Sequence, residues 1–353
     1  KLYNNQVFIA DNIKEVIPEF LMLLKGVIDC PDLPLNVSRS ALQNDGFVKK
    51  ISDYITKKVA DKLAGMCKTD KEEYDKYWDD ISPFIKFGCL KDDKFCEKMN
   101  DYILFKNLDG KYLTLKDCIE ENKKEETKAV EEEKTEEKAS EGSQNEEPEK
   151  TVIYYVTDEV QQSQYINMFK AAKMDAVILT HNIDQPFISQ LEQKNEGIKF
   201  QRIDADVTDA LKSKTSKKAE KEMEEQAESI SKLMKKALKN DKITVKVEKL
   251  KNKKISSMIT LSEESRRMQD MMKMYAMPGM DPNMFGAPAQ VLTLNANNTL
   301  VKYLFEHGDA DNAKIICEQL YDLAMLSHTT LAPDEMTKFV QRSNEILEMI
   351  AKF

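Results

Sequence analysis

At 353 residues, with 41% hydrophobic and 33% charged side chains, the chain is long enough for two or three globular domains with heavily solvated surfaces. Its net charge of −9 argues against nucleic acid as a partner, because binding to phosphates needs a basic face. No apolar run reaches the roughly 18 residues that would span a membrane, so we expect no membrane partner.

The six cysteines lie far apart in the sequence and form neither a C-x-x-C pair nor a cluster with histidines. In a long chain this spacing predicts reduced thiols, unpaired in the core or on the surface, and a cytoplasmic location. No metal-ligand pattern stands out, so we expect no metal site. The cysteines are Cys30, Cys67, Cys89, Cys96, Cys118 and Cys317.

The first 30 residues are expected to form a strand and a helix. The chain starts without a methionine or a signal-peptide core, and Gln6–Ile9 has the composition of a strand in mid-course. We therefore expect a fragment whose N-terminal part is missing. An Asp/Asn cap signal and apolar residues at helical spacing predict a helix over residues 11–28.

Two longer helices are predicted over residues 42–66 and 70–87, where apolar residues recur every three or four positions. Before them, the segment DLPLNVSRSALQND (residues 32–45) sets a single cation, Arg39, in a polar loop at a helix start. A helix N-terminus already carries partial positive charge and free N–H groups, so a cation gains nothing from the helix. We expect Arg39 to face either an anionic group or solvent.

Residues 120–150 differ sharply in composition from the rest of the chain. They contain 13 Glu and 6 Lys, a net charge of −7, which is most of the chain's −9. With few apolar residues, this stretch cannot bury enough surface to offset the entropy of ordering it. We predict a disordered, solvated insertion, with an acidic docking segment as the alternative.

Order resumes at TVIYYVTDE (residues 151–159), a β-branched and aromatic run typical of a strand buried on both faces. The order β-α-β-α-β over residues 151–212 predicts a small parallel sheet with right-handed crossovers. Such units can bind nucleotides, but neither G-x-G-x-x-G nor G-x-x-x-x-G-K-[ST] occurs here. A packing domain is the favoured interpretation, and a nucleotide-binding α/β domain is the enzyme alternative.

Residues 213–353 are expected to form an α+β domain that ends in a helical hairpin. A long charged helix (213–240) precedes the strand KITVKVEKL, its neighbour SSMITL and a methionine-rich stretch around 268–284. Two amphipathic helices at 309–328 and 334–352 form the hairpin, and two copies would complete a four-helix bundle in a homodimer. Docking of the hairpin onto the preceding domain is the alternative. The predicted interface residues are Ile316, Leu320, Leu323, Phe339, Val340, Leu347 and Ile350.

The string DLPLNVSRSALQ, preceded by IPEFLMLLKGVID, resembles the middle domain of the ninety-kilodalton heat-shock chaperones, and more narrowly of their bacterial HtpG-like members. The resemblance continues through VIYYVTD, the methionine-rich stretch, LTLNANNTLV and the hairpin, and so omits only the acidic insertion. It implies a multidomain α+β and α/β fold. Residues 1–119 would be the distal part of a middle domain, 120–150 the insertion, 151–212 a small α/β subdomain and 213–353 a C-terminal dimerisation domain.

The resemblance also implies a role for the polar loop. In this family the arginine of the loop reaches the γ-phosphate of ATP, which an N-terminal domain holds together with magnesium, and Arg39 matches that arginine. Asn36 and Gln43 match polar positions of the loop and would hold it or contact the nucleotide region. ATP and magnesium would therefore bind outside this fragment, which should not hydrolyse ATP by itself.

The methionine-rich stretch matches an amphipathic element that contacts partly folded client proteins in the cleft between family protomers. Thioether side chains are unbranched and polarizable, so they repack against varied apolar surfaces. An ordinary helix packed on its own domain is the alternative. The residues expected to contact clients are Met271, Met272, Met274, Tyr275 and Met277, with Phe187 and Ile188 of the middle domain as further candidates.

Together these features predict the middle and C-terminal parts of an ATP-dependent chaperone, which acts as a cytoplasmic homodimer on unfolded or partly folded client proteins. Two alternatives stay open at this point. One is a dimeric interaction scaffold without client binding, and the other is the nucleotide-binding α/β domain.

Overall fold

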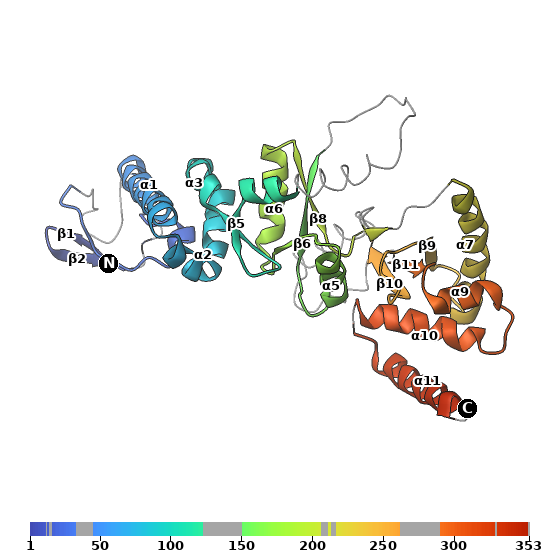
Figure 1. Cartoon of the computed structure of the whole chain (residues 1–353). Helices are drawn as coiled ribbons and strands as arrows, with labels where there is room; N and C mark the ends of the chain where they lie inside the picture. Colours follow the sequence, from blue (N-terminus) through green and yellow to red (C-terminus); the bar gives the residue numbers. More distant parts are fainter. Residues whose placement is uncertain are drawn as a thin grey trace, which may run out of the picture. The chain divides into compact units, whose positions relative to one another are not determined.

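The computed structural model describes residues 1–11, 13, 16–32, 45–122, 150–205, 211–212, 217–261, 290–328 and 330–351. The chain forms two compact units, whose elements are labelled in Figure 1. The first contains the described residues of 1–122, 150–151 and 181–199, and the second contains those of 152–180 and 200–351. None of the described helices combines the length and the apolar character that crossing a bilayer requires.

A small sheet opens the first unit. Its central strand β1 (Leu2–Asn4) pairs antiparallel with β2 (Val7–Ala10) and parallel with β3 (Ile28–Asp29). β2 confirms the strand that was predicted near the start of the chain.

The helix predicted over residues 11–28 is wrong. The regular structure described there consists of a single 3-10 turn, Glu19–Leu21, and the strand β3. Pro18 lacks an N–H group and lies in an extended conformation directly before the turn, so it interrupts the helical pattern. At the other end, the N–H of Ile28 donates to the carbonyl oxygen of Lys1, which commits that segment to the sheet.

The body of the first unit consists of α1 (Asp45–Thr69), α2 (Lys71–Lys91) and α3 (Asp93–Met99), and the first two confirm the long helices predicted from the apolar spacing. Asp70 and Asp92 separate the three helices. Each carboxylate accepts a backbone N–H three residues later, which is the hydrogen bond of a helix N-cap.

A second 3-10 turn, η2 (Asn100–Tyr102), leads into the antiparallel pair β4 (Leu104–Asn107) and β5 (Tyr112–Thr114). α6 (Asp184–Lys194) returns to this unit and packs against α2. The contact contains a buried ion pair, in which Lys86 Nζ lies 2.5 Å from Asp184 Oδ1. Both charges are removed from water, so removing either one would leave the other buried without a partner, at a high cost in free energy.

The second unit begins with a strand that has a hydrogen-bonded neighbouring strand on each side. β6 (Thr151–Val156) lies between β7 (Val177–Ile178) and β8 (Ile198–Arg202) and runs parallel to β7. α5 (Ser163–Ala171) connects β6 to β7, and its buried Tyr165 donates a hydrogen bond from its hydroxyl to the carbonyl oxygen of Ile259.

That oxygen belongs to the C-terminal sheet, which has the order β10-β11-β9. Its strands are β9 (Thr244–Glu248), β10 (Ser257–Leu261) and β11 (Gln290–Asn295). The prediction that KITVKVEKL and SSMITL are neighbours is wrong, because β11 lies between them, parallel to β9 and antiparallel to β10. β11 is buried on both faces, and its Val291, Leu292 and Leu294 suit the central position. Leu261 at the end of β10 pairs directly with Gln290 at the start of β11.

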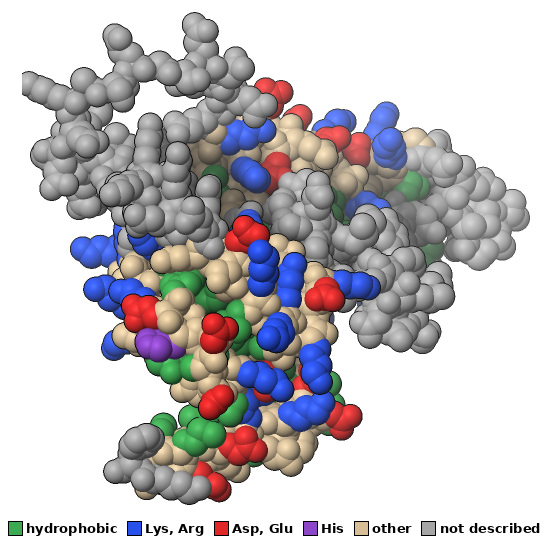
Figure 2. All heavy atoms as spheres, turned by 90° about the vertical axis from the view of Figure 1, so that its right-hand side faces the viewer, with side chains coloured by type: hydrophobic (Ala, Val, Ile, Leu, Met, Phe, Trp, Pro, Cys, Tyr) green, Lys and Arg blue, Asp and Glu red, His purple; other side chains and the backbone are tan. Residues whose placement is uncertain are grey.

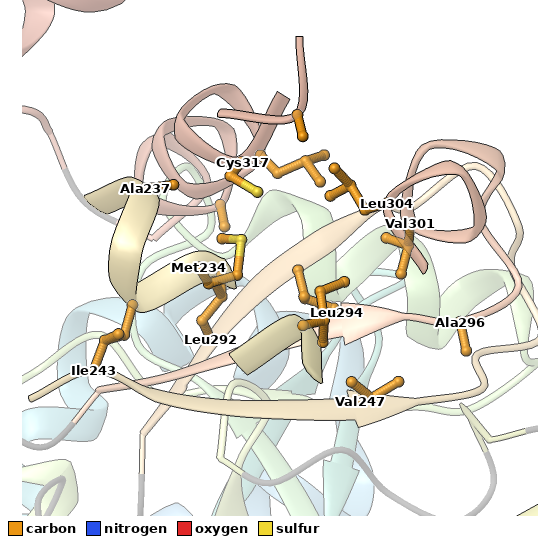
Figure 3. Packing of buried hydrophobic residues seen from close by; sticks show 14 of the residues in the cluster. Met234, Ala237, Ile243, Val247, Leu292, Leu294, Ala296, Val301, Leu304 and Cys317 are labelled. Atoms are coloured by element: carbon orange, nitrogen blue, oxygen red, sulfur yellow. The ribbon is translucent and has the colours of Figure 1, made fainter. Parts of the chain in front are cut away.

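The described helices of this part of the chain are α7 (Lys217–Leu238), α9 (Thr299–Glu306), α10 (Ala313–Leu326) and α11 (Pro333–Ala351). α7 and α10 pack against each other, with α7 also on β9 and α10 on β10. Figure 3 shows Met234 of α7 and Cys317 of α10 gathered with Leu292 and Leu294 of β11 in one hydrophobic core. This core fixes α10 firmly to the sheet.

Candidate functional site: the C-terminal helix pair

α10 uses one side of its surface for the core of the second unit. Its buried residues are Ala313, Cys317, Leu320 and Ala324, which recur every three or four positions. The carbonyl oxygen of Leu320 also accepts a hydrogen bond of 2.7 Å from the Ser257 hydroxyl on β10. α10 is therefore a rigid base for whatever packs on its other side.

α11 is held to this base by a polar clamp centred on Arg342. The Arg342 guanidinium donates to Gln319 Oε1 at 2.9 Å and to Glu318 Oε2 at 3.3 Å, and it also pairs with the carboxylate of Asp322. Ser343 and Gln319 add a side-chain hydrogen bond of 3.1 Å. Only 10% of the Arg342 side chain is exposed, so these are charge-assisted bonds in a largely desolvated setting.

Most of α11 nevertheless faces solvent. Among the residues of α11, all of whose side chains the structure describes, Arg342 is the single buried one. Figure 2 shows hydrophobic side chains on the surface at the lower end of the molecule, where α11 lies in Figure 1. The large exposed apolar residues of α11, with their exposed fractions, are Met336 (37%), Val340 (48%), Leu347 (62%), Met349 (46%) and Ile350 (66%).

Four of these residues lie along one side of the helix. Met336, Val340, Leu347 and Ile350 are separated by four, seven and three positions, which is the spacing of a helical stripe. Leu323 of α10 is exposed by 42% as well. An exposed apolar stripe of this length on an otherwise charged helix is a feature of interaction surfaces.

The predicted interface residues therefore fall into two groups. Leu323, Val340, Leu347 and Ile350 are exposed, and Phe339 is half-buried. Leu320 is 1% exposed and belongs to the core of its own unit, with Ile316 packed against that core. The assignment of Leu320 to a dimer surface is corrected accordingly, since β10 and its neighbours already cover this side of α10.

The structure also corrects the client-contact assignment in the first unit. Phe187 and Ile188 lie in α6 with 0% and 4% of their surfaces exposed, so they are core residues. The predicted nucleotide-loop residues and methionine-segment residues lie outside the described residues. These are Asn36, Arg39, Gln43, Met271, Met272, Met274, Tyr275 and Met277.

The loop after β6 bears on the nucleotide-binding alternative, because an anion would use free N–H groups there. Gln162 Oε1 accepts the backbone N–H groups of Thr157 at 2.8 Å and Asp158 at 3.1 Å. The Asp158 carboxylate accepts those of Val160 and Gln161, both at 3.0 Å. The loop's own side chains thus occupy these donors and add a negative charge, which disfavours phosphate binding.

The first unit contains a cavity of about 1400 Å³ between its N-terminal segment and α2. Its lining is mainly aliphatic and aromatic and includes Leu21, Ile55, Phe84, Phe87 and Ile183. Such a lining offers few groups that could hold a charged nucleotide. Among the described residues, no three His, Cys, Asp or Glu side chains form a group that could hold a metal ion.

The sequence matches the family model described as Hsp90 protein over residues 1–130 and 140–353. The residues left out of the match lie inside the acidic stretch. The chain is 34% identical over 98% of its length to the chaperone protein HtpG of Bacteroides thetaiotaomicron, of which it covers 46%. It is 36% identical over 86% of its length to the HtpG of Bacteroides fragilis strain YCH46, of which it covers 42%.

A third relative is the HtpG of Porphyromonas gingivalis. The chain is 35% identical to it over 79% of its own length and covers 38% of that protein. The chain thus spans somewhat less than half the length of these curated relatives. The family model covers nearly all of the chain, including both units and the C-terminal helix pair. The chain belongs to the Hsp90 protein family.

Proposed function

We propose that this chain is the middle and C-terminal part of an ATP-dependent, HtpG-like chaperone that binds partly folded proteins. In the whole protein it would form a homodimer through α10 and α11. The observation that carries this proposal is the exposed apolar stripe of α11, a helix that Arg342 fixes to α10. A rigidly held apolar stripe suits an isologous contact, in which two copies bury the same surface.

Sedimentation of the whole protein tests the interface. Leu347→Asp places a charge in the centre of the stripe, so we expect the dimer to dissociate into monomers. Gln341→Asp introduces the same charge on an exposed position of α11 away from the stripe and should leave the dimer intact. Unchanged sedimentation of the Leu347→Asp protein would place the interface elsewhere.

The nucleotide would bind to an N-terminal domain outside this chain, with magnesium, and would supply the phosphate that Arg39 meets. Guanidinium is always charged and offers a planar fork of donors to phosphate oxygens. Asn36 and Gln43 would hold the loop in place. In the whole protein, Arg39→Ala should lower ATP turnover while nucleotide binding stays nearly unchanged, and turnover at the wild-type rate would reduce Arg39 to a tether for its loop.

Clients would bind to the methionine-rich segment, with Met271, Met272, Met274, Tyr275 and Met277 as the contact residues. An assay of light scattering by an aggregating, denatured test protein measures this activity. Met271→Ser combined with Met274→Ser should reduce the suppression of aggregation. Met22→Ser, at an exposed methionine of the first unit, is the control for loss of a surface methionine. A dimer that never slows aggregation would instead be an interaction scaffold.

A further inference from the structure

Two cysteines that are seven residues apart in the sequence come together where α2 meets α3. Cys89 lies near the end of α2 and Cys96 lies within α3. Both side chains are buried, with 0% and 2% of their surfaces exposed. The two thiols are close enough for each to shift the pKa of the other. Nothing in the proposed chaperone activity uses this pair.

α6 supplies polar groups to the same sulfur. Lys194 Nζ lies 3.5 Å from Cys96 Sγ, and Gln190 Oε1 lies 4.0 Å from it. Gln190 also contacts the other cysteine, because its Nε2 donates a hydrogen bond of 3.3 Å to the carbonyl oxygen of Cys89. One sulfur is thus surrounded by an ammonium group, an amide and a second thiol.

The buried Cys96 sulfur contacts a side chain that reaches the surface. The Lys194 ammonium that contacts it also pairs with Asp93 at 3.0 Å, and these two side chains are 41% and 82% exposed. The sulfur is therefore separated from solvent by a flexible surface side chain.

The two thiols differ strongly in acidity. The hydrogen bond from Cys89 and the nearby Lys194 ammonium lower the pKa of Cys96, against the opposing effect of burial. The same hydrogen bond and burial raise the pKa of Cys89. Burial also raises the pKa of Cys67 and that of Cys317. Thiolates react much faster than thiols, so Cys96 is set apart from these other cysteines.

Close packing keeps the pair together. Gly88 precedes Cys89, and a Cβ atom added at Gly88 would lie 2.7 Å from the Phe20 ring and 2.8 Å from the Phe95 ring. Phe95 in turn precedes Cys96, so α2 and α3 are in tight contact beside both thiols. Asp92 caps α3 and fixes the turn between the helices.

We propose that Cys96 is an oxidation site for hydroperoxides, with Cys89 as the resolving thiol. The Cys96 thiolate attacks one oxygen of hydrogen peroxide, the O–O bond breaks, and the other oxygen leaves as hydroxide, which takes up a proton to form water. Cys96 is then a sulfenic acid. The Cys89 sulfur attacks the Cys96 sulfur, the S–O bond breaks, the hydroxyl leaves as water with the Cys89 proton, and a disulfide forms. A low-molecular-weight thiol reduces it again by exchange.

Peptide mapping of the whole protein tests the proposal directly. The reduced protein is treated with hydrogen peroxide, free thiols are blocked, and the protein is cleaved with trypsin. Cleavage after lysine releases the two thiols in separate peptides, FGCLK (87–91) and FCEK (95–98). We expect these two peptides to be recovered as one disulfide-linked species, formed before the thiol of Cys317 reacts.

Variants separate the two roles. With Cys89→Ser, a sulfenic acid should be trapped at Cys96 by dimedone without any linked peptide. Lys194→Gln should slow the oxidation of Cys96 by up to about 10-fold below pH 6, since loss of the neighbouring charge raises the thiol pKa from about 6 and, below the pKa, a shift of one unit changes the thiolate fraction tenfold. Lys98→Gln, on the same helix as Cys96 but paired with the exposed Asp61, is the control and should leave the rate unchanged.

Several results would overturn the proposal. FCEK recovered reduced while the Cys317 peptide is oxidised would remove Cys96 as the reactive thiol. Sulfenic acid at Cys96 of the wild-type protein without the linked peptide would remove Cys89 as the resolving thiol. These readouts come from wild-type protein, so they stand even if a variant fails to fold, and they do not depend on dimerisation or client binding.

Discussion

Replacing Arg342 with methionine should release α11 from α10 while leaving the rest of the second unit folded. The substitution keeps the length and the apolar part of the side chain but removes the bonds to Glu318, Gln319 and Asp322. α10 itself is buried against β10 and α7, so its position does not depend on the clamp.

The size of the effect follows from the burial of the clamp. Removing one partner of a buried ion pair costs about 3–5 kcal/mol, because the other charge is left unpaired. Glu318 and Asp322 keep 29% and 15% of their side chains exposed, so water compensates part of the loss. We therefore expect α11 to lose about 2–4 kcal/mol of docking free energy. This corresponds to amide exchange that is faster on the order of 30- to 1,000-fold.

Hydrogen exchange of peptides from residues 333–351, followed by mass spectrometry, measures this directly. The comparison is made in a Leu347→Asp background, so that a change in assembly does not contribute. Lys314→Met is the matched control, because it removes an exposed ion pair of 3.8 Å to the same Glu318 and should cost at most about 0.5 kcal/mol. Equal exchange in the Arg342→Met and Lys314→Met proteins would refute the clamp.

Three further substitutions test the packing, each by urea or guanidinium unfolding. Gly88→Ala should destabilise the first unit by about 1–3 kcal/mol, since its Cβ would overlap two aromatic rings. Gly65→Ala, in a helix with nothing within 4 Å of the new methyl group, should stabilise it by about 0.5–1 kcal/mol. Asp184→Asn leaves the Lys86 ammonium buried without a charge partner and should cost about 3–5 kcal/mol. Burial raises the pKa of Cys317 from 9.0 to about 12, so its contribution to stability is complete below pH 9 and is lost as the pH rises towards 12. The difference in unfolding free energy between wild type and Cys317→Ala should therefore shrink above pH 9, by up to about 1.4 kcal/mol per pH unit.

The long helices could be read from the sequence because their spacing is local. Apolar residues at helical intervals predicted α1 and α2, and capping aspartates mark their boundaries. The same signal failed over residues 11–28, where Pro18 and the pairing of β3 with β1 override it. Strand pairing is decided by residues far away in the chain, so the position of β11 between β10 and β9 could not be seen either.

The site was predictable only in outline. An amphipathic stripe shows that one side of a helix is covered, but it does not show what covers it, and so Leu320 was assigned to a second copy although the core of its own unit covers it. Arg342 was missed altogether. A signal was present, since Glu318 and Asp322 are four residues apart on α10 and α11 carries a lone arginine on a mostly apolar side. The pairing of Cys89 with Cys96 could not be predicted from the spacing C-x6-C, because the bend between α2 and α3 brings the two cysteines together.

The pairing of Leu261 with Gln290 has a consequence for engineering. Leu261 and Gln290 are separated by 28 residues of sequence but occupy opposed positions, whose Cα atoms in an antiparallel pair are only about 5 Å apart. A two-residue type I′ turn such as Asn-Gly closes such a gap, so the whole intervening segment can be excised without shifting the register of either strand. A protein without residues 262–289 would keep the sheet and its helices. It would separate the function of the methionine-rich segment from the stability of the domain.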